Sequence, residues 1–326
     1  MLLFNVPTLV LLGVVLAILA VSTAIGQLLK RQPDSAIHPA VVRTFNSRVQ
    51  AWWLLCTSVA LAFLCGRGAT IILFFFVSFW ALREFITLTP TRLGDHRALF
   101  WVFFVLTPLQ YVLVFLGPEM YGLYSIAIPV YGFLFIPARI ALSGDYKRFL
   151  ERAAKIQAGL LICVYTLSFA PALLDMDLVQ YDAEGNATPW ENGNPAGLLF
   201  YFLFIAQLGE VMQYFWSQFL GRHVIAPEIN STRTWEGFCG GIASTTFVGI
   251  LLWWATPFNY WQSACMAAVI AVLGFAGGMT MSAIKRDRGV QDYGTLVEGH
   301  VGVLDRIDSI CFAAPVFFHL TKYFFT

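Results

Sequence analysis

The chain has 326 residues, of which 58% are hydrophobic and only 12% are charged. About 25% of the residues of a typical soluble domain are charged, so this composition excludes an ordinary soluble protein. The formal net charge of +1 says little by itself, and no nucleic-acid partner is expected. The apolar residues form near-continuous runs, which predict a single polytopic membrane domain.

These runs predict an all-α polytopic membrane protein with about ten transmembrane helices, since about 20 residues cross the hydrocarbon core. Glycine, proline and polar residues separate the runs. The expected spans are 5–27, 50–66, 69–88, 98–116, 120–142, 156–174, 196–220, 237–256, 262–284 and 309–325. We divide the chain into N-terminal helices at 1–195, about six of them, and a C-terminal catalytic region at 196–326 that carries both polar motifs.

The distribution of charge predicts how these spans are oriented. All but two of the 20 lysines and arginines fall in the loops at 28–49, 83–97, 139–155, 221–236 and 285–308. The loop at 175–195 is acidic and contains neither lysine nor arginine. Because positively charged loops stay in the cytoplasm, the basic loops are expected there and both termini outside.

The N-terminal region offers one charged pair of interest. Arg83 and Glu84 follow an aromatic run at the cytoplasmic end of the third expected span. Such a pair is typical of a snorkelling anchor, in which arginine reaches the interface beside a counter-ion. Contact with a lipid headgroup is the alternative.

The stretch 210–241 combines an intramembrane acid with a polar loop. Glu210 lies deep in an apolar span, where a carboxylate indicates either a functional site or a helix–helix hydrogen bond. Thr234 is a candidate helix N-cap followed by an interfacial tryptophan, and Glu236 is a second acid beside the cationic loop. Gly240 and Gly241 favour close helix packing.

A third stretch, Ser282–Asp308, concentrates charge between two apolar runs and is therefore expected at a membrane–water boundary. Its cations, Lys285 and Arg286 among them, suit phosphate oxygens. Three of its carboxylates are hard oxygen ligands suited to Mg²⁺: Asp292, Asp305 and Asp308. An ordinary cytoplasmic loop that obeys the positive-inside rule is the alternative.

The order of these residues resembles the C-terminal signature of the phosphatidate cytidylyltransferases, also called CDP-diacylglycerol synthases. The pattern is Ser-x-x-Lys-Arg, then an Asp, then Gly-His-x-Gly-x-x-Asp-Arg-x-Asp. The matching residues are Ser282, Lys285, Arg286, Asp292, Gly299, His300, Gly302, Asp305, Arg306 and Asp308. Upstream, Arg233 and Thr234 resemble the Lys-Thr of the family's second block.

The chain departs from the family pattern at several positions. Gln291 stands where the family has Lys, Val301 where it has a second Gly, and Glu210 where it commonly has Asp. An Asp is also common at the position of Gly278. If the site works without that acid, Glu210 or Asp287 is expected to supply the missing charge.

The resemblance implies that the cytidylyl group of CTP is transferred to phosphatidate, giving CDP-diacylglycerol and pyrophosphate. It assigns the catalytic residues Ser282, Lys285, Arg286, Asp292, His300, Asp305, Arg306 and Asp308, and the substrate-binding residues Glu210, Arg233, Thr234 and Glu236. Mg²⁺ would be held by Asp292, Asp305 and Asp308. The implied localisation is the bacterial inner membrane, with an active-site funnel that faces the cytoplasm. Membrane lipid is the expected partner, and a homodimer is compatible with the resemblance.

Three alternatives remain open at the level of sequence. A relative that uses another lipid phosphate or another nucleotide would keep the aspartates. A catalytically silent paralogue with a binding or regulatory role would keep the fold. A transporter would show inverted repeats or broken helices in both halves, and the sequence shows neither.

Overall fold

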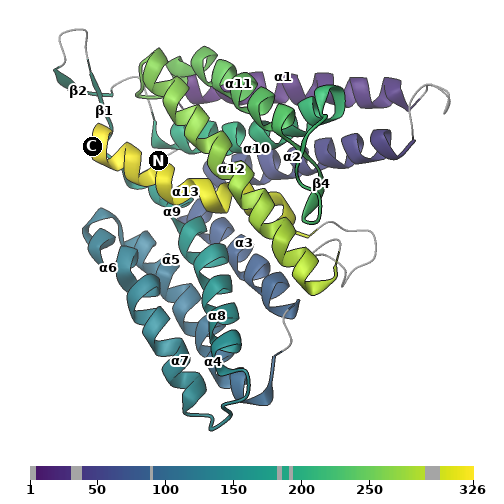
Figure 1. Cartoon of the computed structure of the whole chain (residues 1–326). Helices are drawn as coiled ribbons and strands as arrows, with labels where there is room; N and C mark the ends of the chain where they lie inside the picture. Colours follow the sequence, from purple (N-terminus) through teal and green to yellow (C-terminus); the bar gives the residue numbers. More distant parts are fainter. Residues whose placement is uncertain (1–4, 31–38, 89–90, 182–185, 191–193, 291–301) are drawn as a thin grey trace.

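The computed structural model describes residues 5–30, 39–88, 91–181, 186–190, 194–290 and 302–326. Within these ranges the chain is mostly helical, which confirms the predicted all-α class (Figure 1). The helices are α1 (Val6–Leu29), α2 (Pro39–Cys65), α3 (Arg67–Thr87), α4 (His96–Trp101), α5 (Thr107–Leu116), α6 (Tyr121–Ile126), α7 (Phe133–Ala141), α8 (Phe149–Leu160), α9 (Thr166–Ala172), α10 (Pro195–Leu220), α11 (Trp235–Leu251), α12 (Tyr260–Arg288) and α13 (Leu304–Phe325).

Wide π-helical turns join several short helices into longer continuous ones. Val102–Leu106 connects α4 to α5, Ala127–Gly132 connects α6 to α7, and Leu161–Tyr165 connects α8 to α9. The second of these turns contains Pro129, whose missing backbone N–H cannot support regular α-helical hydrogen bonding. Narrower 3₁₀ turns occur at Leu93–Asp95, Pro118–Met120, Leu173–Asp175 and Trp253–Ala255.

All ten expected spans fall on helices, but they do not all have the same apolar length. Among the described residues, seven helical stretches are long and apolar enough to cross a membrane: Val6–Leu28, Arg67–Thr87, Leu93–Leu116, Pro118–Ala141, Phe149–Asp175, Pro195–Leu220 and Tyr260–Arg288. The apolar part of α2 is limited to Trp52–Cys65, α11 has 17 residues, and α13 begins with a charged turn. The number of membrane crossings and their orientation therefore stay predictions.

The helices form two groups that meet at α13 (Figure 1). One group contains α3 to α9, and the other contains α1, α2, α10, α11 and α12. Helix α13 lies at their junction, where it packs against α12 on one side and α9 on the other. Helix α10 is the most enclosed element of the second group, because all of its residues from Ala196 to Gly209 are buried.

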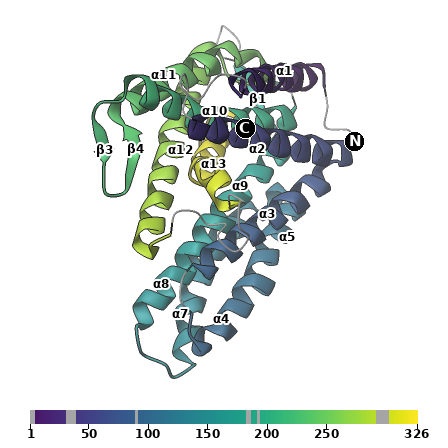
Figure 2. The same cartoon turned by 90° about the vertical axis from the view of Figure 1, so that its right-hand side faces the viewer.

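Two short antiparallel hairpins complete the described structure. Strand β1 (Val179–Tyr181) pairs with β2 (Ala187–Pro189), and β3 (Val224–Ala226) pairs with β4 (Asn230–Thr234). Figure 2 shows the β3–β4 hairpin beside α11 and α12. Strand β4 ends at Thr234, and α11 begins at the next residue. The polar side chains of β4 therefore lie next to the N-terminus of α11.

The start of α11 packs closely on α10, as the glycines predicted. A Cβ atom on Gly240 would lie 2.6 Å from Cγ of Trp216, and one on Gly241 would lie 2.8 Å from Cα of Gln213. No larger side chain fits at such distances without movement of α10. This contact fixes β4, which precedes α11, against the C-terminal part of α10.

Candidate active site

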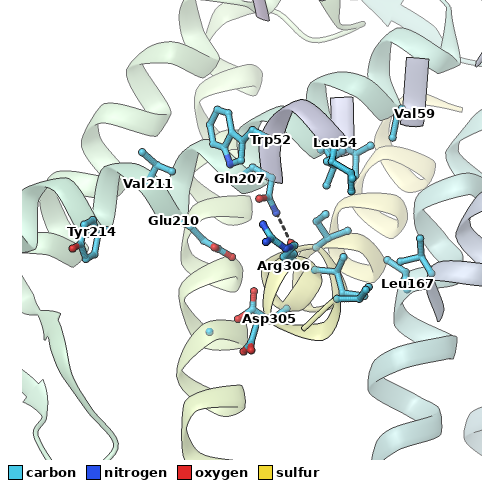
Figure 3. A pocket seen from close by; sticks show the side chains of 18 of the residues that line it. Trp52, Leu54, Val59, Leu167, Gln207, Glu210, Val211, Tyr214, Asp305 and Arg306 are labelled. Atoms are coloured by element: carbon cyan, nitrogen blue, oxygen red, sulfur yellow. Dashed lines mark hydrogen bonds between the residues drawn. The ribbon is translucent and has the colours of Figure 1, made fainter. Parts of the chain in front are cut away.

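A pocket of about 730 Å³ lies where α2, α3, α10, α12 and α13 meet (Figure 3). Its wall on α2 and α3 is mostly apolar and includes Leu55, Phe74 and Val77. Its other wall carries the charged lining residues, which are Glu210, Arg233, Lys285, Asp305, Arg306 and Asp308. Residues from both sequence motifs therefore share one pocket, although they come from four different elements.

Helix α10 contributes a polar stripe to this pocket. Gln207, Glu210 and Tyr214 are spaced three and four residues apart, so they share one helical face. The side-chain amide of Gln207 donates to the carbonyl of Arg306 at 2.9 Å, as the dashed line in Figure 3 shows. Sequence reasoning singled out Glu210 but not Gln207, although the helical spacing of these polar residues in an apolar span was a usable signal.

The pocket holds a close carboxylate pair. Asp308 is only 8% exposed, and its carboxyl group lies close enough to that of Glu210 for direct electrostatic interaction. The Oε1 atom of Glu210 is buried and receives no hydrogen bond from any donor that the structure describes. Two neighbouring buried acids with an unsatisfied oxygen form a natural position for a cation.

Asp305 has a different environment from Asp308. Its Oδ1 atom accepts a hydrogen bond from Nζ of Lys285 at 2.7 Å, so an ion pair joins α12 to α13. Both side chains are largely buried, which makes the pair stronger than an exposed one. Asp305 is therefore already paired with a protein cation, whereas Asp308 lies beside a second carboxyl group, that of Glu210.

Arg233 reaches the pocket from β4. Its Nη1 atom donates to Oε1 of Gln213 at 2.9 Å, and its guanidinium lies 5.9 Å from the ring centroid of Phe275. The guanidinium also lies beside Gly278 on α12, near the carboxylate of Asp308. An arginine held in this way presents a fixed, bidentate donor to an anionic ligand.

Ser282 connects α12 to β4. Its hydroxyl donates to the carbonyl of Gly278 at 2.7 Å and accepts from the side-chain amide of Asn230 at 3.1 Å. Both Ser282 and Asn230 line the pocket. Their contact sets the position of β4, and with it Arg233, relative to α12.

Three residues assigned to the site by sequence lie outside the pocket lining. Thr234 caps α11 by accepting from the backbone N–H of Gly237 at 3.1 Å, as its pattern predicted. The guanidinium of Arg286 is exposed and donates to the carbonyl of Ile229 at 3.2 Å. The side chain of Glu236 contacts that of His223. A role for Thr234, Arg286 and Glu236 in binding or catalysis stays a prediction.

Glu236 anchors the loop before β3. It accepts from the ring Nδ1 of His223 at 2.5 Å and from the backbone N–H groups of Arg222 and His223. The side-chain hydrogen bond from His223, followed by the backbone hydrogen bonds, lowers the pKa of Glu236 to about 2. The carboxylate, at the loop end of α11 before the expected span 237–256, stays ionised at physiological pH and acts as an anchor.

Asp292 and His300, with the departing positions Gln291 and Val301, lie outside the described residues. No group of three or more His, Cys, Asp or Glu side chains that could hold a metal is found in the described part of the chain.

Asp287, one of two acids expected to replace the charge missing at Gly278, is exposed and pairs with Arg288 at 2.7 Å. Glu210, the other, lines the pocket.

Comparison with known proteins supports the signature. A sequence profile of the cytidylyltransferase family matches residues 46–324. "Uncharacterized protein YnbB" of Escherichia coli is 32% identical over 317 residues, which covers 96% of this chain and 97% of that protein. A phosphatidate cytidylyltransferase of Synechocystis is 35% identical over 129 residues, 38% of this chain and 44% of that protein. One from Staphylococcus epidermidis is 28% identical over 184 residues, 53% of this chain and 70% of that protein.

These matches differ in extent. The similarity to the Synechocystis enzyme covers less than half of either chain, whereas the similarity to the Escherichia coli protein extends over nearly the full length of both. The family profile covers both the charged wall of the pocket and its apolar wall. The chain belongs to the cytidylyltransferase family.

Proposed function

We propose that this protein transfers the cytidylyl group of CTP to phosphatidate within a membrane, giving CDP-diacylglycerol and pyrophosphate. The observation that carries the proposal is the two-sided pocket, in which a charged wall on α10, β4, α12 and α13 faces an apolar wall on α2 and α3. A phosphate monoester attached to acyl chains needs both surfaces in one place. A water-soluble phosphate acceptor would need only the charged one.

In the proposed reaction, a phosphate oxygen of phosphatidate attacks the α-phosphorus of CTP. The new P–O bond forms as the bond between the α-phosphorus and the pyrophosphate oxygen breaks. The nucleophile is already an anion, so no general base is required. The protein must therefore align the two anions and stabilise charge on the departing pyrophosphate.

The cations of the pocket suit this task. Arg233 can bind phosphate oxygens through two N–H groups, whereas Lys285 presents a point charge that is shared with Asp305. Arg306 stands at the same wall, next to the Asp305 that holds Lys285. Among the described lining residues, however, three carboxylates match these three cations. Two polyanionic substrates therefore require additional positive charge.

We propose Mg²⁺ as the source of that charge. The Glu210–Asp308 pair fits the ion, because Mg²⁺ usually binds through one or two protein carboxylates together with substrate phosphates. When bound, Mg²⁺ would supply charge neutralisation at the phosphate oxygens. Asp292 remains a proposed third ligand, and Asp305 is better placed to orient Lys285.

Lipid phosphates other than phosphatidate are also tested as acceptors. The Escherichia coli protein matches this chain over nearly its full length, whereas the phosphatidate cytidylyltransferases of Synechocystis and Staphylococcus epidermidis match 38% and 53% of it. We therefore propose an assay in which purified protein receives labelled CTP, Mg²⁺ and one of several lipid phosphates. Phosphatidate should be the best acceptor, and the product should partition into chloroform. Preference for another lipid phosphate would identify a related transferase. CTP binding without transfer to any lipid would identify a silent paralogue.

A further inference from the structure

Glu84 lies on α3, more than 200 positions before the helix that it contacts. Its Oε1 atom accepts from the backbone N–H of Val303 at 3.0 Å, and its Oε2 atom accepts from the N–H of Leu304 at 2.9 Å. The indole N–H of Trp80 also donates to Oε1, at 3.2 Å. Glu84 is only 7% exposed, so these contacts are shielded from solvent.

The contact is made with the N-terminus of α13. The first N–H groups of a helix have no partner within the helix, and they favour a negative charge. Val303, which precedes the helix, has helical backbone angles and provides no side-chain cap to it. Within the described residues, the carboxylate of Glu84 takes the place of the local capping side chain that α13 lacks.

The arrangement differs from the expected anchor at Arg83 and Glu84. The exposed guanidinium of Arg83 lies 5.1 Å from the ring centroid of Trp80, whereas Glu84 points inward to α13. The two neighbours therefore serve different purposes. Arg83 stays compatible with an interfacial role, whereas the side chain of Glu84 is buried within the protein.

We propose that Glu84 is a positioning residue that holds the first turn of α13 and thereby sets the positions of its acidic side chains. Asp305 follows Leu304 directly, and Asp308 lies one helical turn further on. A small shift of this turn would move Asp305 relative to Lys285 and Asp308 relative to Glu210. Helix α3 would thus act on the charged wall through this buried carboxylate.

The experiment compares Glu84→Gln, Glu84→Asp and Asp95→Asn in the full-length protein. Glutamine keeps the shape but removes the charge and one acceptor, whereas aspartate keeps both with a shorter reach. Asp95 is the matched control, since it is another buried carboxylate, held by Arg152 at 2.9 Å and outside the pocket lining. Amide hydrogen exchange of the segment 302–309, melting temperature, and kcat and KM for CTP are measured for each.

In Glu84→Gln we expect faster exchange at 302–309 and a fall in kcat of about 100-fold, because misplacement of about 1 Å can cost that much. The KM for CTP should stay within about threefold, since the loss lies in alignment and not in binding. Glu84→Asp should be intermediate in both readouts. Asp95→Asn should lower the melting temperature without faster exchange at 302–309 and with little change in kcat.

Unchanged exchange at 302–309 in Glu84→Gln would overturn the inference. So would an equal loss of kcat in Asp95→Asn at a similar fall in melting temperature, because the effect would then be general instability. The kinetic readout rests on the proposed function, but the exchange readout does not. If the wild-type protein transfers nothing from CTP, the proposed function fails while hydrogen exchange still decides whether Glu84 holds α13.

Discussion

The guanidinium of Arg233 lies over Gly278. A Cβ atom on this glycine would be 3.2 Å from Nη2 of Arg233 and 3.6 Å from Oδ2 of Asp308. The family that this chain resembles commonly has an aspartate at the position of Gly278. Here the arginine side chain takes up the space that such a residue would need, so the missing acid and the guanidinium belong to one local arrangement.

We therefore expect Gly278→Ala to displace the guanidinium of Arg233 and to lower kcat/KM for CTP by about tenfold, because the proposed phosphate-binding donor would lose its alignment. Steady-state kinetics with varied CTP provide the measurement. Gly274→Ala on the same helix is the control: its Cβ atom would lie equally close, 3.2 Å, to Cβ of Ser309 instead of an arginine. Equal losses in the two variants would point to helix packing and not to Arg233.

The ion pair between Lys285 and Asp305 predicts non-additive effects. Each of Lys285→Gln and Asp305→Asn should strongly lower kcat/KM, since each leaves a largely buried charge without its partner. The double variant should lose little more than either single variant, with a coupling energy of about 1.5–3 kcal/mol. The four proteins of this cycle are compared by kcat/KM. Additive losses would mean that the two residues act independently.

The apolar wall of the pocket predicts a dependence on acyl-chain length. Val77→Trp should reduce transfer to long-chain phosphatidate by about tenfold, because overpacking an apolar site costs about 1–3 kcal/mol. Transfer to dihexanoyl phosphatidate should change less. Ile72→Trp on the same helix is the control, since Ile72 is 56% exposed and does not line the pocket. Loss of transfer to both acceptors alike would argue against an acyl-chain site on α3.

The distribution of charge predicts orientation, which cysteine labelling can measure in intact cells. Ala187→Cys in β2 should react with an impermeant reagent from outside, and the exposed Asp287→Cys should react only after the membrane is opened. Gly289 is a poorer site because its φ of +69° disfavours a side chain. The exposed native cysteines, Cys65, Cys239 and Cys265, are replaced first. Labelling of Asp287→Cys from outside would reverse the orientation.

Much of the fold and part of the site could be predicted from the sequence. Long apolar runs gave helices such as α10 and α12, because length and composition are sufficient for this inference. Motif order alone suggested that Glu210, Arg233 and Asp308 belong together, and they do line one pocket. The cap at Thr234 was also predicted correctly, since capping depends on local residues.

Partnerships between distant segments could not be predicted in the same way. Lys285 and Asp305 both belong to the signature, but their ion pair depends on how α12 and α13 pack. The sequence pattern predicts an interfacial pair of Glu84 with its neighbour Arg83, whereas the backbone groups that Glu84 contacts, those of Val303 and Leu304, lie at the start of α13. Sequence spacing describes one helix face well, but it carries no information on which faces meet.

The most direct test of the central claim follows the α-phosphate of CTP. Purified protein is given phosphatidate, Mg²⁺ and CTP labelled at either the α- or the γ-phosphate, with Asp308→Asn as a parallel sample. The proposed reaction predicts that α-label enters chloroform-soluble CDP-diacylglycerol while γ-label leaves in pyrophosphate. Asp308→Asn should reduce this transfer by at least about 100-fold. Entry of γ-label into lipid, or no transfer of α-label by the wild-type protein, would contradict the account.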